Sequence, residues 1–294
     1  VGLGQDRADF HALAFARERV QSRDVGAPKN PSVPIIRHPD VRRMLLRMRA
    51  QTEAARALAI ATGYAFDLAE AHPDAEVRKA TQAFVELMIP VHKGWATEMA
   101  QDVTYQGIQV HGGMGFVEET GAAQHYRDAR ITTIYEGTTA IQANDLVGRK
   151  MAREGGVTAK ALITTMRAFC AELAKSSNPH LKASHKRLVE GIDAVERAVE
   201  FNLANFNQNV RACFAGSVPM VKLFGIVCGG WQLARVALAA EQRINAGSDD
   251  RAFLEAKIAT MRYFADTMIP EAIAAAEVIV NGSEGTLALA EAAF

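Results

Sequence analysis

Cysteine is scarce in this 294-residue sequence, which has three: Cys170, Cys213 and Cys228. They lie far apart in apolar surroundings and form no Cys-x-x-Cys pair, so nothing indicates a disulfide framework or a cysteine-ligated metal. We expect free thiols packed in a core, in a protein of the reducing cytoplasm.

An excess of charge of either sign is also missing. Lys plus Arg and Asp plus Glu each total 33, so the formal net charge is +0 at pH 7. This balance provides no global field for nucleic acid or for an anionic membrane. The expected partner is therefore a small molecule or another protein, and no nucleic acid.

Long uninterrupted apolar runs are absent as well. The most apolar stretch, Leu223 to Ala240, contains Gln232 and Arg235 together with two adjacent glycines. We therefore predict a buried helix there and no membrane span. The first residues, "VGLGQDRADF", have neither the basic start nor the apolar run of a signal peptide, and because they begin with Val1 we expect an excised piece of a longer protein.

Aromatic residues make up 7% of the chain although 49% of it is hydrophobic. The apolar share therefore comes mostly from Ala, Leu, Ile, Val and Met, which favour helices packed closely side by side. No stretch alternates polar and apolar residues over the length of a strand, so strands should be scarce. The predicted fold class is all-α.

Two long helices are predicted first. Apolar residues recur at three-to-four spacing from Pro39 to about His72, and again from Glu76 to about Val110. A proline in the first turn is a typical helix start, and Pro90 predicts a kink inside the second helix.

The paired glycines in "REGGV" (Arg153 to Val157) predict a domain boundary, giving domains at residues 1–155 and 156–294. The second domain is expected to be an antiparallel helical bundle. Glycine, proline and capping residues predict its helix breaks at Ser176–Pro179, Ala215–Pro219, Asn245–Asp250 and Asn281–Gly285.

Several common catalytic and metal-binding patterns are not found. A di-iron bundle needs Glu-x-x-His spacing, which is missing, and His180 and His185 lie five residues apart, on different faces of a helix. The sequence also has no Gly-x-Ser-x-Gly elbow, P-loop or His-Glu-x-x-His motif. We predict no metal site.

Two glycine-bearing stretches remain, Gly107 to Glu119 and Ile134 to Thr139. The glycines of the first either end a helix in the left-handed conformation or leave the backbone bare for a flat or phosphorylated ligand. In the second, Glu136 either favours the N-terminus of the helix that begins near Thr138 or acts as a base.

Together these stretches resemble the acyl-CoA dehydrogenases, flavoenzymes that desaturate acyl-CoA thioesters. The resemblance rests on "YQGIQVHGGMGFVEETGAAQHYRDARITTIYEGTTAIQANDLVGRK" (Tyr105 to Lys150), and "AFARERVQSRD" (Ala14 to Asp24) is similar to the first helix of the family's C-terminal domain. The fold implied is the family's C-terminal helical bundle, followed from about Gly156 by a second helical-bundle extension. Such an extension is typical of the subgroup that includes 3-methylmercaptopropionyl-CoA dehydrogenase.

The resemblance assigns roles to residues of both stretches. Glu136 matches the family's catalytic base, which removes the α-proton of the thioester while the β-hydrogen leaves as hydride to flavin N5. The resemblance also implies that the enolate oxygen accepts hydrogen bonds from the backbone N–H of Glu136 and from a ribityl hydroxyl of FAD. The matching cofactor-binding residues are Arg19, Gln109, Gly112, Gly113 and Thr138.

Among these, Gln109 and the two glycines match contacts to the diphosphate-adenosine arm of FAD. Arg19 matches an arginine that reaches the flavin nucleotide of a neighbouring subunit. The chain departs from the family pattern at Ser22, Pro39 and Ala140, where relatives carry phenylalanine, glutamine and glutamine. For Arg127 and Asp128 we expect a structural ion pair in preference to catalysis.

The resemblance further implies an acyl-CoA substrate, electron-transfer flavoprotein as electron acceptor, and a homodimer; adjacent Gly229 and Gly230 indicate a close helix contact. The family's N-terminal helical and middle β domains are missing, so we expect the isolated chain to be colourless and inactive. An acyl-CoA oxidase stays open as an alternative. So does a DNA-associated relative, for which the extension offers Lys182, Lys186 and Arg187.

Overall fold

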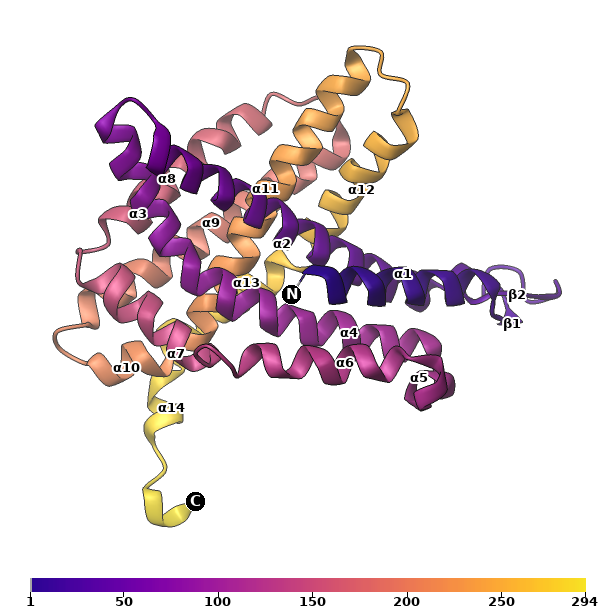
Figure 1. The fold of residues 1–294 in the computed structure, drawn as a ribbon, viewed down its shortest axis with the longest axis horizontal. Helices are drawn as coiled ribbons and strands as arrows, with labels where there is room; N and C mark the ends of the chain where they lie inside the picture. The colour runs from indigo at the N-terminus through magenta and orange to yellow at the C-terminus, as the bar shows by residue number, and fades with distance from the viewer. Residues whose placement is uncertain (1) are drawn as a thin grey trace. The chain divides into compact units, whose positions relative to one another are not determined.

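A computed structural model describes residues 2–294, so the expectation attached to Val1 lies outside the described residues. Helices account for nearly all of it (Figure 1), which confirms the predicted all-α class. Two short strands, β1 (Val20–Arg23) and β2 (Ser32–Pro34), form the one sheet found in the described part of the chain.

The chain packs into two compact units. The first contains the described residues up to Glu53 together with Ala96–Glu136, and the second contains Ala54–Trp95 and Gly137–Phe294. The domain boundary predicted after residue 155 stays a prediction. At that place Gly155 and Gly156 both have positive φ, 65° and 74°, and helix α8 begins at Val157.

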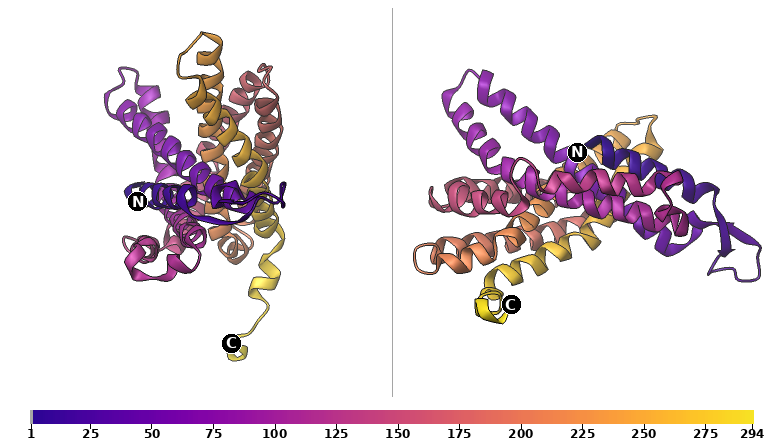
Figure 2. Two further views of the ribbon diagram at one scale, coloured as in Figure 1. Left: turned by 90° about the vertical axis from the view of Figure 1, so that its right-hand side faces the viewer. Right: turned by 60° about the horizontal axis from the view of Figure 1, so that its bottom comes forward.

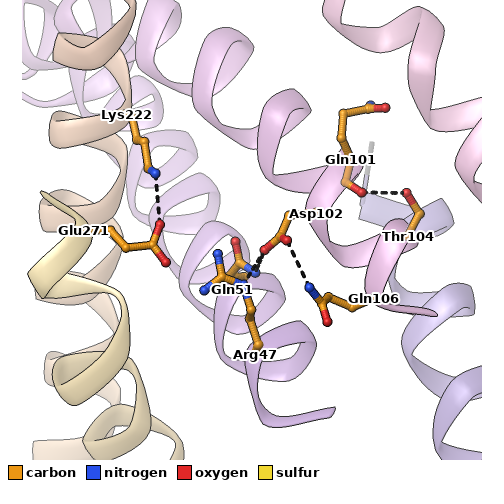
Figure 3. A network of polar contacts seen from close by, with 8 residues as sticks. All are labelled: Arg47, Gln51, Gln101, Asp102, Thr104, Gln106, Lys222 and Glu271. Atoms are coloured by element: carbon orange, nitrogen blue, oxygen red, sulfur yellow. Dashed lines mark hydrogen bonds and ion pairs between the residues drawn. The ribbon is translucent and has the colours of Figure 1, made fainter. Parts of the chain in front are cut away.

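In the first unit, α1 (Gly2–Glu18), α4 (Thr97–His111) and α6 (Ala122–Arg130) pack against one another, and α5 (Gly113–Phe116) follows α4. The Asp102 carboxylate on α4 holds the first part of α2 (Pro39–Ala71). Arg47 Nε and Gln51 Nε2 donate to it at 2.6 and 2.7 Å (Figure 3). Because this ion pair is largely shielded from solvent, it fixes the register of the two helices better than an exposed pair would.

The segment Ala14–Asp24, whose sequence is similar to the family's first C-terminal-domain helix, is helical only in part. Helix α1 ends at Glu18, and β1 pairs antiparallel with β2 (Figure 2). The reason is the turn that follows, in which Asp24 Oδ1 accepts from the N–H of Gly26 at 2.9 Å. The strand pairs are Val20 with Pro34 and Arg23 with Ser32, so β1 carries one extra residue, and Ser22 bulges at φ 61°.

In the second unit, α11 (Ser217–Asn245) lies among α9 (Pro179–Asn205), α12 (Arg251–Thr267) and α13 (Ile269–Asn281), as Figure 1 shows. The other helices there are α8 (Val157–Leu173), α10 (Val210–Ala215) and α14 (Ser283–Leu287). These bounds confirm the predicted helix breaks. Lys222 Nζ on α11 lies 2.9 Å from the Glu271 carboxylate of α13. Helix α14 contacts α10 and α13, and after it the chain extends away from the bundle (Figure 2).

Helix α11 is the buried helix predicted from Leu223 to Ala240. Among the described residues it alone is long and apolar enough for a bilayer span, but 78% of its most apolar window is buried inside the chain. The three cysteines are free and buried, as predicted. Burial raises the pKa of Cys170 to about 11 and that of Cys228 to about 12, so both stay unreactive thiols.

The regular helix is interrupted directly after Pro90, where a kink was predicted. Helix α3 (Ala75–Val91) passes into a π-helical turn, His92–Ala96, before α4 begins. Proline lacks the N–H that an α-helical turn needs, which loosens the helix at this point. In the same turn, burial lowers the pKa of His92 to about 4, and its Nε2 lies 2.9 Å from the Thr62 hydroxyl.

The π-helical turn delivers Trp95 to a face of α11 that lacks side chains. A Cβ at Gly225 would lie 2.0 Å from Trp95 Cγ, and one at Gly229 would lie 2.7 Å from Trp95 Cη2. A Cβ at the neighbouring Gly230 would lie 2.9 Å from Phe264 Cε1. The expected close helix contact at Gly229 and Gly230 is therefore made inside the chain, so these glycines give no support to a dimer.

The glycine face of α11 yields a stability prediction. Gly225→Ala should destabilise the chain by about 3 kcal/mol, since the new methyl group overlaps the Trp95 ring. Gly63→Ala is the matched control, because Gly63 lies inside α2 with nothing within 4 Å of a Cβ. Alanine there should stabilise by up to about 1 kcal/mol. Urea unfolding measures both, and equal effects of the two substitutions would contradict the packing.

Candidate cofactor and catalytic site

Helix α4 ends at Gly112, the first glycine of the "HGGMG" stretch. Gly112 has φ 59° and ψ −140°, a conformation open mainly to glycine, and its N–H donates to the Gln109 carbonyl at 3.0 Å. Gly112 therefore ends the helix, but in a positive-φ conformation that differs from the left-handed helical one expected.

The two glycines that follow differ from it and from each other. At Gly115 a Cβ would lie 2.3 Å from the Ile108 carbonyl oxygen, so close packing requires glycine. Gly113 has no positive φ, and nothing lies within 4 Å of a Cβ built there. Neither conformation nor packing within the described chain accounts for its missing side chain. The bare backbone leaves room for a ligand to approach closely.

His111 fastens this end of α4 to α1. Its side chain is 4% exposed, its Nδ1–H donates to the Gly107 carbonyl at 2.7 Å, and its ring lies 4.5 Å from that of Phe15. The His11 ring on α1 lies 4.6 Å from the His111 ring and 6.1 Å from the His125 ring on α6, measured between ring centroids. Burial lowers the pKa of His111, and positive charge on the other two histidines lowers it further, although the Gly107 hydrogen bond opposes this. His111 is therefore a neutral anchor for the turn.

The same contact brings Arg19 to this end of the unit. Arg19 follows Phe15 by one turn and donates its backbone N–H to the Phe15 carbonyl at 2.9 Å. Because the Phe15 ring contacts His111, Arg19 comes to the end of the unit where Gln109, Gly112 and Gly113 lie. All four residues are exposed to solvent, so the Arg19 cation lies at the same end as the bare glycine backbone.

Glu136 lies in the turn between α6 and α7 (Thr139–Asn144). It has φ 52°, a left-handed conformation unusual for a residue with a Cβ, and Gly137 after it has φ 94°. Its side chain is exposed to solvent. Thr138 caps α7, its Oγ1 accepting from the Ile141 N–H at 3.4 Å. Since Thr138 serves the helix terminus, Glu136 is not needed as its cap.

The predicted site residues of the first unit thus form two groups. Helices α4 and α6 lie side by side and antiparallel (Figure 1), with Gln101 Nε2 donating to the Ala129 carbonyl at 2.7 Å. The Arg19 and glycine group lies at one end of this pair, and Glu136 follows the other end. Helix α6 and the 3-10 turn Ile131–Thr133 separate the groups along the chain by on the order of 20 Å.

Arg127 forms the structural ion pair expected of it, but its partner is Glu118. The guanidinium donates to both carboxylate oxygens, at 2.7 and 3.2 Å. This pair is exposed and ties α6 to the turn before it. Among residues 7–294, whose side chains the structure describes, no group of three or more His, Cys, Asp or Glu could hold a metal ion.

Comparisons with protein families cover most of the chain. Residues 11–151 match the acyl-CoA dehydrogenase C-terminal domain, and residues 162–290 match the acetyl-CoA dehydrogenase C-terminal-like family. The 3-methylmercaptopropionyl-CoA dehydrogenase of Ruegeria pomeroyi is 49% identical over 96% of this chain and 47% of that protein. The broad-specificity linear acyl-CoA dehydrogenase of Mycobacterium tuberculosis is 34% identical over 97% of this chain and 48% of that protein. The chain spans about half the length of the curated relatives it matches.

Solved structures share the fold at low sequence identity. An acyl-CoA dehydrogenase complexed with FAD from Bacillus anthracis superposes with a TM-score of 0.72 at 19% identity, covering 96% of this chain and 47% of that one. Arabidopsis thaliana acyl-CoA oxidase 1 gives 0.60 at 15% identity, covering 95% and 48%. Dehydrogenases and an oxidase therefore have the same helical architecture in this region.

The left-handed turn predicts an unusual order of stability between two substitutions. Glu136→Gly should leave the chain more stable than Glu136→Ala by about 0.5–1 kcal/mol. Glycine relieves strain of about 1–2 kcal/mol, while its greater freedom in the unfolded chain offsets part of the gain. Urea unfolding of the two variants measures the difference. An alanine variant as stable as the glycine variant would show that the turn is not strained.

Proposed function

Because the chain belongs to the acyl-CoA dehydrogenase family, we propose that it is the base-bearing C-terminal part of an FAD-dependent enzyme that desaturates an acyl-CoA thioester. The observation that carries this proposal is Glu136, which stands in a left-handed turn inside the "YEGT" sequence. Strained conformations of this kind concentrate at functional sites. The 49% identity to the Ruegeria pomeroyi enzyme supports placement in its subgroup.

In the proposed reaction the Glu136 carboxylate takes the proton from the α-carbon of the thioester. An α-proton is weakly acidic, so the carboxylate must be held against the carbon and shielded from water when substrate is bound. The positive φ of Glu136 and of Gly137 sets the direction in which this side chain leaves the backbone. We expect its carboxylate to face a concave surface of the longer protein.

Bound FAD would accept the β-hydrogen as hydride. Gly113 supports FAD binding at this end of the first unit, since no contact inside the described chain requires glycine at that position. Arg19 and the backbone around Gly112 offer positive charge and N–H groups suited to a diphosphate. Gln109 lies beside them on the last turn of α4. Thr138 lies close to the proposed base because it follows Glu136 by two residues in the sequence.

Partners of the longer protein follow from the same assignment. We propose a homodimer in which Arg19 reaches the flavin nucleotide of the neighbouring subunit. The position of Arg19 at the end of the unit opposite Glu136 supports such sharing. Electron-transfer flavoprotein is the proposed acceptor and the cytoplasm the proposed location. An oxidase would differ in passing electrons to oxygen, which anaerobic and aerobic turnover of the longer protein separate.

No observation favours the DNA-associated alternative. Of its three cations, Arg187 is engaged by the Glu190 carboxylate at 2.8 Å. Lys182 and Lys186 lie exposed on α9. They resemble the ordinary solvated face of a helix.

Glu136→Gln in the longer protein should lower turnover about 10²- to 10⁴-fold, since the amide keeps the shape but cannot accept a proton. FAD content should stay as in the wild type. Glu119→Gln, at an exposed carboxylate in the turn before α6, is the control and should leave turnover unchanged. A Glu136→Gln enzyme with a tenth of the wild-type rate would remove Glu136 as the base.

Gly113 tests the cofactor assignment separately. In the longer protein, Gly113→Ala should weaken FAD binding about tenfold or more, because the methyl group occupies space left for the ligand. In the 294-residue chain it should leave the unfolding midpoint unchanged, whereas Gly115→Ala should lower it. FAD titration of the apoprotein gives the affinity. Unaltered FAD affinity would show that this glycine does not face the cofactor.

A further inference from the structure

Two neighbouring hollows in the second unit have no role in the proposed reaction. One, of about 370 Å³, lies between α3 and the π-helical segment Asp145–Ala152. The other, of about 600 Å³, lies between α7, the same segment and the chain around α10. Arg149 and Arg153 line both hollows, so a single ligand can lie across this pair of arginines. The larger volume is within the range of small-molecule sites.

The smaller hollow has surplus positive charge. Its lining includes four cations, Lys79, Arg149, Lys150 and Arg153. Lys150 is paired with Glu86 at 3.1 Å, and Arg149 with Asp145 at 3.0 Å. The remaining carboxylate of the lining, Glu154, accepts from the N–H and hydroxyl of Thr158 at the start of α8. Among the described residues no carboxylate is left for Lys79 or Arg153. An anion is the ligand that would complete this hollow.

The larger hollow is different in character. The Phe206 and Phe214 rings line it with centroids 6.1 Å apart and planes tilted by 49°. Both residues are half-buried, so part of each remains accessible at the hollow that they line. Gln142 and Asn144 place side-chain amides on the same lining. Aromatic faces beside amides suit a flat heterocycle with polar edges.

We propose that the two hollows form one site for a nucleoside diphosphate, with the base against Phe206 and Phe214 and the phosphates at Arg153 and Lys79. The π-helical segment makes this possible, because it brings Arg149 and Arg153 to the border of both hollows. An inorganic polyanion would use the cations alone, and a nucleoside would use the aromatic hollow alone. This site lies wholly in the second unit and does not depend on the proposed dehydrogenase function.

ADP is the probe, titrated calorimetrically into the 294-residue chain beside tripolyphosphate and adenosine. ADP should bind at one site per chain, at least tenfold more tightly than either half-ligand. Arg153→Gln should weaken ADP binding about tenfold or more, as expected for a lost charge-assisted hydrogen bond. Phe206→Leu should weaken ADP and adenosine while leaving tripolyphosphate unchanged. Phe214 is unsuitable for this test because its ring packs on Gly148, 3.3 Å from a Cβ built there.

Two control variants show whether ADP binds at these hollows or elsewhere on the chain. Lys175→Gln removes an exposed cation elsewhere in the second unit and should leave ADP binding unchanged. Because FAD and CoA also contain an ADP group, Gly113→Ala tests whether ADP occupies the glycine end of the first unit. Loss of ADP binding in that variant, with Arg153→Gln unaffected, would overturn the proposal. Absence of saturable ADP binding, or tripolyphosphate binding as tightly as ADP, would overturn it as well.

Discussion

The seating of Trp95 on the bare face of α11 is the constraint on which the second unit depends. The Trp95 indole packs so close to α11 that side chains at Gly225 and Gly229 would overlap it, so the helix must be without side chains at both positions. Trp95 reaches it because the chain is widened into a π-helical turn after Pro90. Gly94 in the same turn approaches Val221 just as closely, so the turn as a whole is fitted to α11. A change in that turn would therefore disturb the packing of the longest helix of the bundle.

Sequence reasoning succeeded where the determinants are local. The three-to-four periodicity that predicted α2 and the capping residues that predicted the start of α9 act within a few residues of one another. The β hairpin was missed because its strands are short, lack a regular alternation and depend on the turn at Asp24 and Gly26. The histidine cluster was out of reach for another reason: His11, His111 and His125 come from three helices and meet only after these pack. Likewise, nothing near Trp95 in the sequence reveals that Gly225 will receive it.

The "HGGMG" stretch shows why a motif alone left its meaning open. Three glycines look equivalent in sequence, yet one is required by backbone conformation, one by contact with Ile108, and one by neither. Only the space around each Cβ position separates these cases. The same test applied to the second unit assigns Gly225, Gly229 and Gly230 to packing, which removes them as evidence for association between chains. Glycine carries functional information where the rest of the chain gives no reason for it.

Glu136 has a constrained backbone, because regular structure precedes and follows it, but its side chain is exposed. The 3-10 turn Ile131–Thr133 precedes it, and the capped start of α7 follows it. The turn between them holds Glu136 in a left-handed conformation, which is strained for a residue that carries a Cβ. On our proposal, the Glu136 carboxylate can act as a base only when further chain and the substrate shield it from water. The residues proposed to bind the nucleotide arm, Arg19, Gln109, Gly112 and Gly113, lie at the far end of the α4–α6 pair, so the first unit would contribute to two separate places. The two groups of proposed site residues lie about 20 Å apart along the chain, so on our proposal a complete site needs further chain, either from the rest of the longer protein or from a second subunit.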